Sequence, residues 1–82
     1  MGGPGPSALQ AVFGRWEEIV GAAASGHSRP VSIARGTLVI AVDQPGWATS
    51  LRALSAQLLK RVEEVAGPGV ADRIEVKVRS SR

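Results

Sequence analysis

The amino-acid sequence predicts an α+β domain in which a three-stranded sheet carries its helices on one face. Three observations support this fold class: apolar residues recur at helical spacing from Leu9 to Ala23, two β-prone runs flank Arg35-Gly36, and Ile74–Val78 alternates strictly. Elements in the order α-β-β-α-α-β bury one layer of helices against one sheet. We expect a flexible leader at residues 1–6, the domain at residues 7–79 and a short tail at residues 80–82.

The first element is predicted as one amphipathic helix that ends at Ser25-Gly26. Ser7 is placed to accept a hydrogen bond from an unpaired amide of the first turn, and Gly26 provides a stop. The register favours a core position for the first tryptophan. The predicted apolar face consists of Leu9, Val12, Phe13, Trp16, Ile19, Val20 and Ala23.

The next two runs, Val31–Ala34 and Thr37–Val42, predict a β-hairpin. Arg35-Gly36 separates them and offers a glycine for a tight turn. The second run is apolar on both faces, so we expect it to be the better covered strand.

A helical segment is predicted from Asp43 to Ala66, with Asp43 as its cap and Pro45 in its first turn. Two interpretations stay open. The segment is either one helix or, as we favour, two short helices that are broken near Leu54, the second capped by Ser55. Trp47, Leu51 and Leu54 are expected to share a face, and Trp47 suits a core position and an exposed anchor about equally.

Gly67-Pro68-Gly69 ends this segment, and the strand at Ile74–Val78 follows. Alternation puts Arg73, Glu75, Lys77 and Arg79 on the solvent side, with Arg82 beyond them. These charges either protect a sheet edge against strand pairing or form a stripe that contacts phosphates. The second interpretation predicts nucleic-acid-binding residues at Arg29, Arg35, Lys60, Arg61, Lys77 and Arg79.

The composition argues against an enzyme. The sequence has no cysteine, its one histidine, His27, has no second ligand or catalytic partner in view, and no phosphate loop is present. Glu17-Glu18 and Glu63-Glu64 are adjacent on helices, so neither pair points at one site. No apolar run is long enough to cross a membrane, and the net charge of +3 permits nucleic-acid affinity without requiring it. We expect no cofactor, no metal and no small-molecule substrate.

Two resemblances follow. The element order is similar to that of type II KH domains, although Arg52-Ala53-Leu54-Ser55-Ala56 stands where such domains carry the Gly-X-X-Gly clamp. Four segments also resemble, in order and spacing, the DciA family of bacterial replicative helicase loaders over about Leu9 to Val78. These segments are Trp16-Glu-Glu-Ile-Val-Gly21, His27-Ser-Arg-Pro30, Gly36-Thr-Leu38 and Trp47-Ala-Thr-Ser-Leu-Arg52.

The DciA resemblance implies a bacterial DNA-replication factor without nucleotide hydrolysis, which engages the hexameric DnaB-type helicase, helps it onto DNA and has some DNA affinity. It places the protein in the cytoplasm, at the nucleoid. Under this hypothesis Trp47, Leu51 and Arg52 are the partner-binding residues. Members commonly carry a basic, disordered extension, which we expect to be absent here or to lie outside this sequence. The alternatives are a KH-like domain whose main ligand is single-stranded DNA or RNA, and a self-associating structural module.

Overall fold

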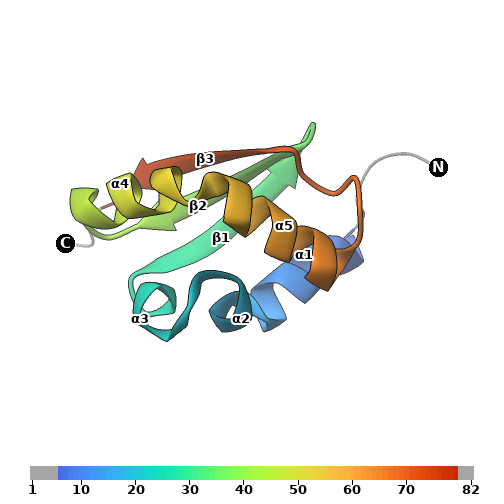
Figure 1. The fold of residues 1–82 in the computed structure, drawn as a ribbon, viewed down its shortest axis with the longest axis horizontal. Helices are drawn as coiled ribbons and strands as arrows, with labels where there is room; N and C mark the ends of the chain where they lie inside the picture. Colours follow the sequence, from blue (N-terminus) through green and yellow to red (C-terminus); the bar gives the residue numbers. More distant parts are fainter. Residues whose placement is uncertain (1–5, 80–82) are drawn as a thin grey trace.

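The structure, a computed structural model, describes residues 6–79, with side chains from Ala8 onward. Figure 1 shows three strands with the helices gathered on one side of them. The predicted cap at Ser7, the basic residue Arg82, and nearly all of the predicted leader and tail lie outside the described side chains. The elements are α1 (Pro6–Gly14), α2 (Trp16–Val20), α3 (Ala22–Ser25), β1 (Ser28–Ala34), β2 (Thr37–Val42), α4 (Pro45–Ala53), α5 (Ser55–Ala66) and β3 (Arg73–Val78).

The sheet has the order β1-β2-β3. β1 pairs with β2 antiparallel, as the predicted hairpin requires, and β3 joins β2 in parallel after the α4–α5 crossover. The predicted α+β class and three-stranded sheet are confirmed. The mixed sheet is compatible with the KH-like topology.

The prediction of one continuous helix from Ser7 to Ser25 was wrong. Two breaks divide it into three short helices. Arg15 leaves helical geometry at φ −124° and ψ 30°, and Gly21 has φ 95°, which glycine adopts more readily than other residues. Helical spacing of apolar residues continues across both breaks, so periodicity alone did not reveal them.

The hairpin turn lies where the sequence predicts it. Arg35 and Gly36 both have positive φ angles, 54° and 78°, as a two-residue turn with the twist of the strands requires. β1 begins at Ser28, three residues earlier than expected. The register shifts between Pro30 and Ser32, which leaves Val31 as an extra residue in the strand.

The break in the second helical segment is confirmed, with Leu54 between α4 and α5. Pro45 opens α4, as expected, but the two predicted caps were wrong. Gln44 is the N-cap residue of α4 and Leu54 that of α5, and neither makes a side-chain capping bond. The carboxylate of Asp43 turns instead to His27.

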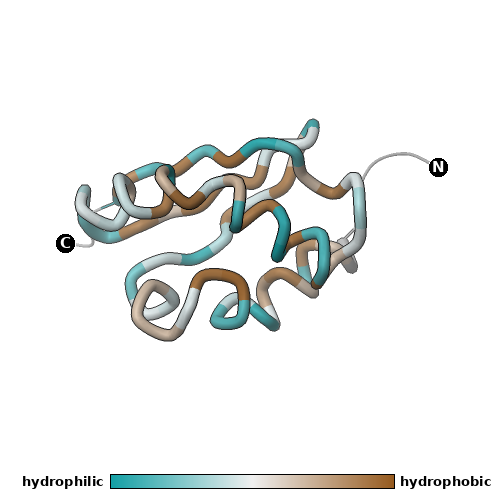
Figure 2. Tube along the Cα trace, viewed as in Figure 1, coloured by the Kyte–Doolittle hydropathy of each residue, from teal (hydrophilic) through white to brown (hydrophobic). Residues whose placement is uncertain are grey.

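The core lies between the sheet and the helices. Figure 2 shows hydrophobic and hydrophilic stretches alternating along the chain, as expected for elements that each bury one side. Trp16 is buried as predicted, and its indole N–H donates to Ser28 Oγ at 3.1 Å. The largest fully buried side chains are Ile19, Leu38, Ile40, Leu51, Val12 and Val62.

The burial predicted for three residues of the apolar faces was wrong. Phe13 and Leu54 are 48% and 43% exposed, and Ala23 is exposed while its neighbour Ala24 is buried. Ala23 follows the break at Gly21, and Leu54 lies at the break between α4 and α5, where the helical register no longer holds. Phe13 lies in α1, just before the break at Arg15.

Gly36→Ala is predicted to lower the free energy of unfolding by about 1–2 kcal/mol, because an alanine would have to adopt a positive φ. Its Cβ would also meet Asp72 Oδ1 at 2.8 Å, although that carboxylate is free to move. Gly14→Ala is the matched control: a Cβ there meets nothing within 4 Å, and the change is expected to stabilise α1 by roughly 0.5–1 kcal/mol. Urea denaturation measures both, and equal effects of the same sign would contradict this description of the turn.

Candidate functional site

The sheet face that points away from the helices is strongly basic. Side chains alternate between the two faces along a strand. On β2, Leu38, Ile40 and Val42 are buried against the helices, so the β2 residues between them point to this face. The residues of β1 and β3 that pair with those point to it as well. We call it the basic sheet face. Its charged members are Arg29, Arg73, Glu75, Lys77 and Arg79, four basic side chains against one acidic one.

The strand register brings three predicted nucleic-acid-binding residues together. Arg29 on β1 pairs with Ala41 on β2, and Ala41 pairs with Lys77 on β3. Arg79 follows two residues after Lys77, and its backbone N–H donates to Val42 O at 2.7 Å. Arg29, Lys77 and Arg79 are all exposed. These cations therefore lie over one end of the sheet.

The other three predicted residues lie elsewhere. Arg35 is at the tip of the hairpin, at the opposite end of the sheet. Lys60 and Arg61 lie on α5 within the helical layer, where the Arg61 guanidinium donates to Ile19 O at 3.1 Å. That bond satisfies a backbone carbonyl near the end of α2, so Arg61 has a structural role.

A second feature, missed by sequence reasoning, joins the start of β1 to the start of α4. His27 Nδ1 donates to Asp43 Oδ2 at 2.9 Å, since a carboxylate only accepts. The same imidazole stacks on Trp47, with ring centroids 5.3 Å apart and planes at 15°. With these two contacts Trp47 is half-buried. This lies between the two alternatives that the sequence left open, a core position and an exposed one. No local signal predicts a pair that is 16 residues apart.

The outward side of α4 is almost free of charge. We call its exposed residues, with the half-buried Trp47, the α4 surface; they are Pro45, Gly46, Thr49, Ser50, Arg52, Ala53 and Leu54. Arg52 is the one charged residue between Gln44 and Leu54, and its guanidinium donates to Val76 O at 3.0 Å on β3. Leu51 is 2% exposed, so it supports α4 from the core and its side chain does not face a partner.

The helical layer is otherwise balanced in charge. Glu17, Glu18, Glu63 and Glu64 are exposed, as expected, and oppose Arg15, Arg52, Lys60 and Arg61. The side-chain hydrogen bond from Arg15, at 2.7 Å, lowers the pKa of Glu18, which keeps that carboxylate ionised. Positive charge is therefore concentrated on the basic sheet face.

Within residues 6–79, no three His, Cys, Asp or Glu side chains gather into a group that could hold a metal ion. None of the described helices is both long and apolar enough to cross a membrane. The surfaces that stand out in the described structure are the basic sheet face and the α4 surface.

The described residues form a compact α+β domain with one open, basic sheet face. Sequence comparison defines the family. The model of the family described as "Dna[CI] antecedent, DciA" matches residues 5–76. The chain therefore belongs to the DciA family, a family of loaders of the DnaB-type helicase. This confirms the resemblance found in the sequence.

Several similar proteins carry the name UPF0232. They include proteins of Mycobacterium leprae (35% identical) and Mycolicibacterium smegmatis (34% identical), each aligned over 79% of this chain and 34% of the relative. A Rhodococcus jostii protein is 31% identical over 79% of this chain and 35% of its own length. The chain thus spans about a third of the length of these relatives.

His27→Ala is predicted to lower the free energy of unfolding by about 1 kcal/mol or less, because the lost hydrogen bond joins two side chains that are 45% and 44% exposed. In a ¹H–¹⁵N spectrum the indole N–H resonance of Trp47 should shift strongly and that of the buried Trp16 should not. An unchanged Trp47 resonance would contradict the stacking.

Proposed function

We propose that this chain is a non-enzymatic adaptor of bacterial DNA replication, which binds the hexameric DnaB-type helicase and assists its loading onto DNA. Family membership is the observation that carries this proposal. Such an activity consists of binding and release, so it needs no cofactor. The proposed place of action is the cytoplasm, at the nucleoid.

The α4 surface is the proposed helicase contact. Interface centres are depleted of charged residues and enriched in tryptophan and arginine. The α4 surface fits this composition, since Arg52 is its one charge and Trp47 lies at its start. His27 and Asp43 fix the first turn of α4, so Trp47 is held in place before a partner arrives. Leu51 contributes from the core side.

The end of the basic sheet face where Arg29, Lys77 and Arg79 gather is the proposed DNA contact. It lies on the opposite side of the sheet from α4, so one chain is able to present a helicase contact and a DNA contact at once. Lysine and arginine side chains neutralise phosphates and release counterions, which gives affinity without sequence preference. Weak DNA binding of this kind suits a loader, because a loader releases the DNA strand after loading.

Trp47→Ala is predicted to weaken helicase binding by more than about tenfold, as removal of an interface anchor does. Biolayer interferometry with the organism's own replicative helicase measures the affinity. Phe13→Ala is the matched control, because Phe13 is a large aromatic side chain that is 48% exposed on α1, outside the α4 surface. It should leave the affinity unchanged.

Circular dichroism shows whether both variants keep the fold. Unchanged helicase binding by a folded Trp47→Ala variant would show that the anchor lies elsewhere. Absence of any helicase binding by the wild-type chain would contradict the proposal itself.

A second candidate function is favoured by the basic sheet face: a KH-like domain whose main ligand is single-stranded nucleic acid. Without helicase, log affinity for a short oligothymidylate should fall with log salt at a slope of about −2, since each of the three cations Arg29, Lys77 and Arg79 releases about 0.7 counterion. Lys77→Ala should reduce the slope by about 0.7, and Lys60→Ala on α5 should not. Tight binding with the full predicted salt slope would favour this function over the adaptor. Weak binding would favour the adaptor.

A further inference from the structure

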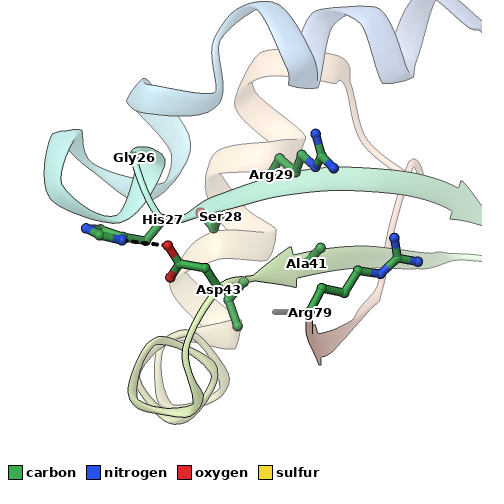
Figure 3. Close-up of a pocket in the computed structure, with 8 residues that line it drawn as sticks. Gly26, His27, Ser28, Arg29, Ala41, Asp43 and Arg79 are labelled. Atoms are coloured by element: carbon green, nitrogen blue, oxygen red, sulfur yellow. Dashed lines mark hydrogen bonds and ion pairs between the residues drawn. The ribbon is translucent and has the colours of Figure 1, made fainter. Parts of the chain in front are cut away.

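A pocket of about 320 Å³ opens at one end of the basic sheet face, beside the His27–Asp43 pair. Its lining includes Arg29, Arg79 and Ala41 from the three neighbouring strands or their ends (Figure 3). We call it the corner pocket. It shares His27 with the stack on Trp47, although it faces the open side of the sheet.

The sequence makes this corner concave. Ala41, on the central strand, is the smallest side chain in its row, and it lies between Arg29 and Lys77. Arg79 is fixed at the far side because its backbone N–H donates to Val42 O at 2.7 Å. Two long basic side chains thus lie on either side of a residue whose side chain is one methyl group. Figure 3 shows Arg29 and Arg79 on either side of Ala41.

We propose that the corner pocket binds a phosphate group of single-stranded nucleic acid, held between the Arg29 and Arg79 guanidinium groups. This inference rests on the proposed function, and it locates the DNA contact at one named site. Guanidinium groups match phosphate oxygens in bidentate geometry, better than lysine ammonium groups do. The pocket's volume lies at the lower end of the range for ligand sites, which suits a group of nucleotide size.

Asp43, the acidic residue of the lining, directs its carboxylate toward His27 and not toward the two arginines (Figure 3). Its carboxylate accepts the hydrogen bond from His27 Nδ1 at 2.9 Å, so it is directed at the imidazole. Among residues 6–79, neither Arg29 nor Arg79 forms an ion pair with a carboxylate. Both guanidinium groups are therefore available to an anion from solution.

The neighbouring aromatic stack favours a single strand over a duplex. Proteins that bind single strands combine a positive groove with aromatic rings on which the unpaired bases stack. The His27 side chain is 45% exposed although one face of its ring lies against Trp47. His27 is also one of the residues that line the corner pocket, so the exposed surface of its imidazole is the proposed place for an unpaired base.

The test measures fluorescence anisotropy of a labelled oligothymidylate with the intact chain and its variants. Arg29→Ala and Arg79→Ala should each weaken binding by about tenfold or more, as loss of a charged hydrogen bond does. Arg73→Ala is the matched control: Arg73 lies on the same face, but it pairs with Thr37 at the hairpin end of the sheet. It should change the affinity less than about twofold, as expected for screened charge alone.

Equal losses from Arg73→Ala and Arg29→Ala would overturn the proposal, because they would show a diffuse electrostatic effect of the whole face. Unchanged binding by an Arg29→Ala/Arg79→Ala double variant would overturn it as well. Arg29→Lys gives a second measure that preserves charge and fold, and it should retain part of the lost affinity but not all of it. Helicase binding by the double variant should be normal, so failure of the pocket and failure of the adaptor function are distinguishable.

Two further arms identify the source of the phosphate. Oligothymidylates with a 5′-phosphate and with a 5′-hydroxyl should bind equally if the pocket holds an internal phosphodiester, and a preference for the 5′-phosphate would assign it to a strand end. A duplex of the same length should bind more weakly than the single strand. Tighter binding of the duplex would contradict the single-strand assignment.

Discussion

The structure depends on one constraint: its helices have enough apolar surface to cover only one face of the sheet. The central strand β2 meets that limit with Leu38, Ile40 and Val42, which are almost completely buried against the helices. On the other face the long side chains of Arg29 and Lys77 flank Ala41, and the polar side chains of Ser32 and Glu75 flank Val39. A chain of this size cannot build a second helical layer. The open face must therefore be compatible with water, and basic residues serve that purpose.

This division gives the molecule two unlike sides. The α4 surface is nearly uncharged, the remaining helical surface is balanced, and the open sheet face is basic. The start of α4 and the end of the sheet meet at His27 and Asp43, which touch both surfaces. A loader that binds a protein ring through its helices and a DNA strand through its sheet would have the two contacts joined at this corner. The same corner carries the proposed phosphate site.

The sequence predicted what short-range patterns determine. Alternation and glycine placement located the hairpin, the last strand and the break near Leu54. Caps and helix interruptions were harder to predict. Gly21 interrupts a helix through its backbone geometry, and Asp43 bonds to a histidine that is distant in the sequence. For the charges on the last strand, the sequence left two interpretations open: protection of the sheet edge and contact with phosphates. Alternation showed that Lys77 and Arg79 share a face, but only the sheet register showed that Arg29 joins them there. The separation of Lys60 and Arg61 from this face likewise followed from tertiary packing.

The central claim is that one chain presents separate surfaces to a helicase and to DNA. Mapping of ¹H–¹⁵N resonances during separate titrations with the replicative helicase and with a short single-stranded oligonucleotide tests it most directly. We predict that helicase broadens resonances of the α4 surface, while the oligonucleotide shifts those of the basic sheet face around Arg29, Ala41 and Arg79. One common set of perturbed residues for both ligands would contradict it.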